Sequence, residues 1–90
     1  MSVVAGNIKY LRKLHQWTQG EFAEKIHIKR SLVGAYEEGR ADPRLNNLLN
    51  MAKVFGVSVD LMITKDLEGK TLEQIQAMDK KSGGAMKVLS

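Results

Sequence analysis

The side chains that could ligate a metal ion or act in catalysis are few and poorly placed. Histidine occurs only at His15 and His27, which are too far apart to share one helix face as ligands. The lack of cysteine excludes disulfides and thiolate metal sites. No Ser–His–Asp set, carboxylate pair in an apolar pocket or phosphate-cradling glycine loop can be assembled from these residues. We therefore predict that the protein is not an enzyme and holds no metal or cofactor.

The charge of the chain favours a polyanionic partner. The formal net charge is +4 and the isoelectric point is about 9.5, a modest basic excess. Lys29 and Arg30 are adjacent cations, a pattern that more often marks a solvated surface than a binding site. The N-terminal residues carry charges where a signal peptide needs an apolar run, and no stretch approaches the ~18 apolar residues that cross a membrane. We expect a cytoplasmic protein.

The spacing of apolar residues predicts helices throughout a single small domain. A first helix runs from about Val4 to Leu14. Thr18 and Glu21 then have the spacing of a capping box, which starts a second helix that ends near Ile26. Trp17, just before that helix, and Phe22, inside it, have the spacing of a hydrophobic staple. We favour core packing for these two aromatics over the alternative, a stacking platform for single-stranded bases.

Three further helices follow after short turns. One runs from about Lys29 to Glu38 and stops at Gly39, which suits a left-handed C-cap. The next has Asp42 and Pro43 as its cap and first position and stops at Gly56. Ser58 caps a short helix that reaches about Ile63.

The chain changes character after residue 65. Residues 65–70 are polar and have the composition of a linker. Thr71 and Gln74 have the spacing to cap one more helix, which carries Leu72, Ile75 and Met78. Glycines at 83 and 84 break that helix, and residues 85–90 are apolar.

Several motifs in order resemble one family. They are TQGEFAEK (18–25), SLVGAYEEGR (31–40), Pro43 and AKVFGVSVDLM (52–62). Together they resemble the Cro/C1-type, XRE-like helix-turn-helix regulators, from Asn7 to Thr64. The resemblance implies an all-α, five-helix bundle of the lambda-repressor-like DNA-binding type, followed by a C-terminal extension. On this basis residues 1–65 form the helix-turn-helix domain, and residues 66–90 form a linker and a short helix.

The resemblance also implies which side chains contact double-stranded DNA. The helix from about 29 to 38 would lie in the major groove. Arg30 is the strongest candidate for reading bases, because a guanidinium pairs bidentately with guanine O6 and N7. Ser31 occupies a position that faces base edges or the adjoining backbone. The expected phosphate contacts are Gln19, Lys29, Arg40 and Asn47.

Three positions depart from the usual family pattern. His27 stands where a glycine is common in the turn, so a left-handed backbone would be strained there. Lys29 replaces a serine-type cap of the recognition helix. Gly34 and Ala35 fall at DNA-contacting positions where longer polar side chains are common. Either Gly34 permits a close approach to DNA or the base contacts are concentrated at the helix start, and Ala35 could offer only apolar contact to a thymine methyl.

Arg12 and Glu37 match a pair that the family uses as a structural salt bridge. The resemblance therefore implies that this pair ties the first helix to the third and does not contact DNA.

Two functions of different classes fit these observations. The first is a repressor that binds a near-palindromic operator as a homodimer. The alternative is an antitoxin or interaction module whose main partner is another protein. That partner would sit on an exposed surface formed by Val57, Leu61, Met62 and Ile63. The apolar 85–90 segment further suggests that the chain is the N-terminal part of a longer repressor with a C-terminal dimerisation domain.

Overall fold

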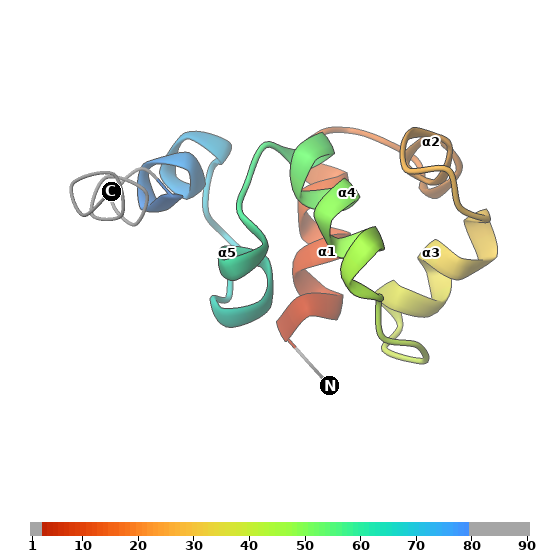
Figure 1. The fold of residues 1–90 in the computed structure, drawn as a ribbon. Helices are drawn as coiled ribbons and strands as arrows, with labels where there is room; N and C mark the ends of the chain where they lie inside the picture. Colours follow the sequence, from red (N-terminus) through yellow and green to blue (C-terminus); the bar gives the residue numbers. More distant parts are fainter. Residues whose placement is uncertain (1–2, 80–90) are drawn as a thin grey trace.

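The fold is built entirely from helices within residues 3–79, the part of the chain that the computed structural model describes. Five helices follow in chain order: α1 (Val3–Leu14), α2 (Gln19–Lys25), α3 (Arg30–Glu37), α4 (Leu45–Phe55) and α5 (Val59–Thr64). A further helix covers residues 72–79. In Figure 1, α2 and α3 form one end of the molecule and the 72–79 helix lies at the other. The predicted all-α bundle with a helix-turn-helix is confirmed.

Side-chain caps set several of the helix boundaries. The backbone N–H of Glu21 donates to Thr18 Oγ1 at 3.1 Å, and the N–H of Thr18 donates to the Glu21 carboxylate at 2.8 Å. This reciprocal pair is the predicted capping box. Ser58 caps α5, and Gly56 ends α4 in a left-handed conformation with φ of 75°. Local sequence signals therefore decide where these helices begin and end.

The start of α4 lies two residues beyond the predicted one. The cap position is Arg44, whose side chain makes no capping hydrogen bond. The backbone N–H groups of Arg40 and Ala41 both donate to the carbonyl of Ala35, so the chain leaves α3 through a wide turn. The residues around Pro43 connect that turn to the first turn of α4.

A stack of aromatic rings packs α2 against the end of α4. The rings of Phe22 and Phe55 lie 4.8 Å apart between centroids, and both side chains are fully buried. Trp17 stacks over Phe22 at 6.2 Å and over Phe55 at 6.1 Å. His15 stacks on Trp17 at 4.5 Å and on Phe55 at 5.8 Å, with Nε2 3.1 Å from the carbonyl oxygen of Phe55. The core-packing interpretation of Trp17 and Phe22 is confirmed.

The segment after α5 packs on the bundle, although its composition predicts a solvated linker. Leu67 and Ile75 are completely buried in the same core as α1 and α5. Thr71 and Gln74 cap the 72–79 helix reciprocally, at 2.9 and 3.1 Å. At the end of this helix, Asp79 accepts a hydrogen bond from the backbone N–H of Ser58 at 2.8 Å. The packed core thus continues past the predicted boundary at residue 65.

One buried polar side chain, Asn7 of α1, holds this segment in place. Its amide nitrogen donates to the carbonyls of Met62 at 2.8 Å and Lys65 at 2.6 Å. Its amide oxygen accepts from the backbone N–H of Leu67 at 3.0 Å. Nearby, the hydroxyl of Tyr10 donates to the carbonyl of Lys70. Asn7 therefore provides partners for three backbone groups that α5 and the following turn leave open.

The surface that we predicted for a protein partner is mostly interior. Val57, Leu61 and Met62 are 7%, 3% and 0% exposed, and only Ile63 reaches solvent. The prediction is wrong because α5 turns its apolar side chains toward α1, with which it makes extensive contact.

Two other predictions concern the C-terminal residues and membrane-spanning helices. The glycine break at 83–84 and the apolar 85–90 segment lie outside the described residues. Among the residues that are described, no helix is long and apolar enough to span a membrane.

Candidate nucleic-acid interface

A tight turn sets the angle between α2 and α3. His27 lies in it with a left-handed backbone, φ of 58°, at the position where we expected strain. The N–H of Ile28 donates to the carbonyl of Ala23 at 3.0 Å, which closes the turn. Ala23 is only 3% exposed where the two helices approach each other. A small residue at this position allows the close contact between α2 and α3.

The start of α3 projects into solvent. Lys29, Arg30 and Ser31 are all exposed, whereas the following residues from Val33 to Glu37 are buried. Lys29 occupies the cap position and makes no capping hydrogen bond with its side chain, in line with the expected weak anchoring. The aliphatic part of the Arg30 side chain passes the start of α2, and its Cδ lies 3.8 Å from the position that a Cβ on Gly20 would occupy. The tip of α3 is therefore free to enter a groove.

Residues that are distant in the sequence meet in a shallow depression beside this tip. It is lined by Gln19, Arg30, Ser31, Gly34, Glu38 and Arg40. Five of these six were predicted as DNA contacts, and the fold places them on one face. The sixth, Glu38, was not predicted.

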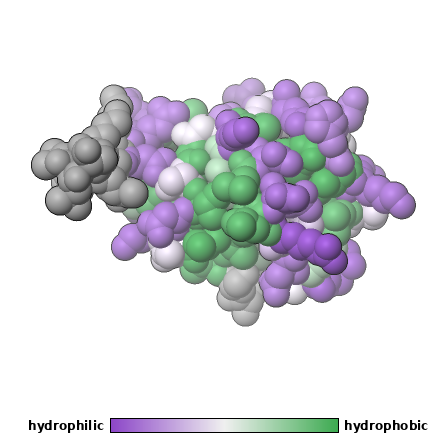
Figure 2. Space-filling view, in the orientation of Figure 1, coloured by the Kyte–Doolittle hydropathy of each residue, from purple (hydrophilic) through white to green (hydrophobic). Residues whose placement is uncertain are grey.

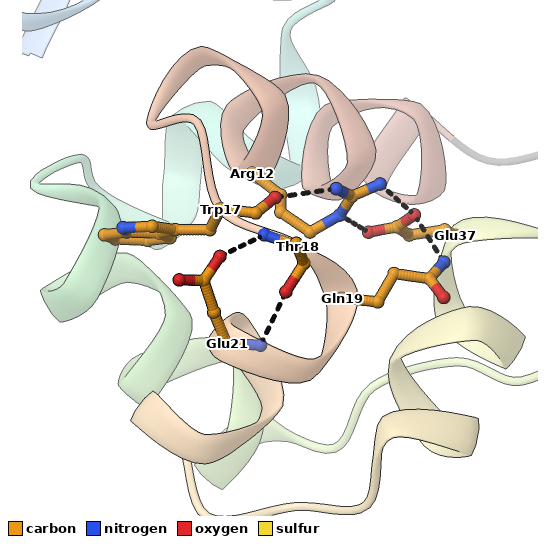
Figure 3. A network of polar contacts seen from close by, with 6 residues as sticks. All are labelled: Arg12, Trp17, Thr18, Gln19, Glu21 and Glu37. Carbon is orange, nitrogen blue, oxygen red and sulfur yellow. Dashed lines mark hydrogen bonds and ion pairs between the residues drawn. The ribbon is translucent and has the colours of Figure 1, made fainter.

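A polar network behind this face joins α1, α2 and α3 (Figure 3). The guanidinium of Arg12 donates to both carboxylate oxygens of Glu37, at 2.6 and 3.0 Å, and to the carbonyl of Trp17 at 2.8 Å. Gln19 donates through Nε2 to the same carboxylate at 3.1 Å. The side chains of Arg12 and Glu37 are 10% and 3% exposed. This pair thus lies inside the fold, where the resemblance places it, and it also orients Gln19.

The other predicted contacts differ in how freely they can reach DNA. Arg40 is 62% exposed and pairs with Glu38, whose Oε1 accepts from Arg40 Nε at 2.9 Å. Asn47 is half-buried and donates to the hydroxyl of Tyr36 at 2.9 Å. Ala35 is 8% exposed, so little of its side chain faces solvent.

Two features of this region have no signal in the local sequence. Glu38 is the C-cap residue of α3, next to Gly39, and nothing in the local sequence distinguishes a functional side chain from a solvated one at this position. Gln16 has a left-handed backbone, φ of 62°, without the glycine that normally signals such a turn.

Electrostatics at the start of α2 favour the charged form of Glu21. Hydrogen bonds from the backbone and then the side chain of Thr18 lower the pKa of this carboxyl below its usual 4.5, and Lys25 lowers it further. Within residues 3–79 no group of three or more metal-ligating side chains comes together.

Comparison with known proteins identifies relatives over most of this region. The profile of a helix-turn-helix family matches residues 8–62. An HTH-type transcriptional regulator of Methanocaldococcus jannaschii is 40% identical over 62 residues, which cover 68% of this chain and 94% of that protein. The regulator ImmR of Bacillus subtilis is 33% identical over 66 residues, which cover 73% of this chain and 52% of that protein. The chain thus spans about half the length of the Bacillus relative.

Solved structures share the same architecture. The hypothetical transcription factor NHTF from Neisseria superposes with a TM-score of 0.68 at 30% identity, covering 74% of this chain and 77% of that one. The P22 c2 repressor protein, crystallised in complex with a synthetic operator, also gives a TM-score of 0.68. It is 20% identical and covers 73% of this chain and 100% of that one.

Proposed function

The chain belongs to the helix-turn-helix family of DNA-binding transcriptional regulators, which are not enzymes, and from that premise we propose that it is a repressor that binds a near-palindromic operator as a dimer. The exposed tip of α3, flanked by Gln19 and Arg40, is the observation that carries this proposal. A recognition helix held in this way enters the major groove while α2 crosses the phosphate backbone. Bound at an operator, the protein would block access of the polymerase.

The side chains of the proposed interface divide into two roles. Arg30 reads guanine through O6 and N7, because this residue is exposed at the tip of α3 and a guanidinium pairs bidentately with those acceptors. Lys29, Arg40, Gln19 and Asn47 contact phosphates and fix the position of the helix on the duplex. Ser31 faces base edges or the adjoining backbone. At Gly34, which lines the depression, the helix backbone itself approaches the bases because this residue has no side chain, whereas Ala35 is only 8% exposed and contributes at most a small apolar contact.

A second copy of the chain is the partner that we propose for the exposed apolar surface. Figure 2 shows apolar side chains gathered between α4 and α5. Leu45, Leu49 and Ile63 of these helices are 65%, 47% and 46% exposed. Pairing through this surface would bring two recognition helices to successive major grooves, roughly 34 Å apart. Leu49→Glu should then yield a monomer by light scattering, with operator affinity reduced and the helix content of each chain retained.

Selection of bound oligonucleotides from a random pool tests the proposed function. We expect one enriched inverted repeat whose half-sites lie one helical turn apart. Affinity for that sequence should fall steeply with salt, and Lys29→Ala should reduce the slope by about 1. Lys9→Ala is the matched control, because it removes the same charge from an exposed position on α1. Binding without any enriched sequence would contradict an operator-specific repressor.

A further inference from the structure

One carboxylate stands on the surface that we assign to DNA. Glu38 is the only acidic residue among the six that line the depression, and its side chain is 60% exposed. A carboxylate near phosphates is electrostatically unfavourable, so the presence of Glu38 on a DNA-binding face requires an explanation. An exposed ion pair contributes little to stability, and the pairing of Glu38 with Arg40 therefore does not supply that explanation.

The neighbouring glycine shapes the surroundings of this carboxylate. Gly34 lies one helical turn before Glu38 and has no side chain to fill the depression. Oε2 of Glu38 lies 3.9 Å from the point where a Cβ on Gly34 would be, and Oε1 of Gln19 lies at the same distance. The carboxylate thus extends back over the backbone of Gly34 toward the start of α3, where the glycine leaves room for it.

The two oxygens of Glu38 differ in what they contact. Oε1 accepts the hydrogen bond from Arg40 Nε. We find no hydrogen bond to Oε2 within residues 3–79. Arg40 therefore screens one side of the carboxylate from phosphates, while the other oxygen keeps its capacity to accept a hydrogen bond.

We propose that Glu38 is a specificity-determining residue that accepts a hydrogen bond from the N4 amino group of cytosine in the major groove. Cytosine presents only this donor there, whereas guanine and thymine present acceptors that repel a carboxylate, and adenine places an acceptor beside its amino group. Arg30 lines the same depression and suits the acceptors of guanine. The two side chains therefore suit G·C base pairs within one half-site of the operator. This inference rests on the proposed function.

The test compares sequences selected from a random pool by the full chain and its variants. Wild type should enrich cytosine at one position of each half-site. Glu38→Ala should reduce that preference about tenfold and leave the other positions unchanged. Glu38→Gln should move the preference from cytosine to adenine, since a carboxamide pairs bidentately with adenine N6 and N7. Glu24→Ala, which removes the same charge from an exposed position on α2 outside the depression, should select the wild-type sequence.

The outcomes separate this inference from the proposed function. If wild type enriches no sequence, both fail. If wild type enriches an operator and Glu38→Ala retains every base preference, the assignment of Glu38 alone is overturned. Matching thermal unfolding of wild type and the Glu38 variants confirms that a changed preference arises at the interface and not from a loss of fold.

Discussion

Replacing Arg12 by methionine measures how much the fold depends on the buried ion pair between α1 and α3. The substitution keeps an unbranched side chain of similar length and removes the guanidinium. Glu37 then retains one donor, Nε2 of Gln19 at 3.1 Å, for a carboxylate that is 3% exposed. The carbonyl of Trp17 also loses its donor.

The expected loss of stability is large for a domain of this size. Breaking a buried pair by removing one partner costs about 3–5 kcal/mol, because the remaining charge is left uncompensated. Small domains have a total unfolding free energy of about 5–15 kcal/mol. The double variant Arg12→Met/Glu37→Met should regain most of the loss, since apolar replacement of a buried pair is often close to neutral. Its recovery should be incomplete because the Trp17 carbonyl stays without its donor.

Urea unfolding followed by fluorescence gives the free energies directly, because Trp17 is the only tryptophan and stacks on the core. Arg40→Met is the control. It breaks a pair whose side chains are 62% and 60% exposed and should cost less than about 1 kcal/mol. A cost for Arg12→Met as small as that of the control would refute the reasoning. So would a double variant no more stable than the single one.

Four further substitutions test individual contacts. Arg30→Ala should weaken operator binding by about 1–3 kcal/mol and relax one base position in a selection experiment, with no change in thermal unfolding. Gly34→Ala should stabilise the protein by about 1 kcal/mol, since the new methyl group meets only ordinary contacts at 3.9 Å, and it should weaken operator binding by filling the depression. Asn7→Ala should cost about 1–3 kcal/mol for each backbone group left unpaired and speed amide exchange at Leu67, as measured by NMR. Thr18→Ala should cost about 1 kcal/mol of stability. It should also raise the pKa of Glu21 toward 4.5 in an NMR titration, because the side-chain hydrogen bond is lost. A carboxyl whose pKa is lowered by folding stabilises the fold at pH values above its unfolded pKa, and this stabilisation is lost as pH falls. The variant should therefore lose less stability on acidification than the wild type does.

Local signals in the sequence were sufficient to predict the elements that position the interface. The capping box at Thr18, the staple at Trp17 and the glycine that ends α4 each act within one or two helical turns. Such signals can be recognised in a sequence because the residues that interact are also neighbours in the chain. The exposed tip of α3 follows from these boundaries.

Contacts between distant residues were not predictable in the same way. Asn7 meets Leu67 across 60 positions, and nothing near either residue reveals the partner. The polar composition of 65–70 therefore predicted a linker, although one buried leucine and one buried amide fix it to the bundle. The same limit explains the error at Leu61 and Met62, because the pattern shows that a short helix is apolar but not which neighbour covers it.

Methylation interference on the selected operator tests most directly whether the tip of α3 enters the major groove. Guanine N7 lies in the major groove and adenine N3 in the minor groove, so each methyl group reports on one groove. We predict that methylation of guanine N7 blocks binding in two clusters one helical turn apart, and that Arg30→Ala abolishes the effect at one guanine of each cluster. Interference confined to adenine N3, or no interference at all, would contradict the account.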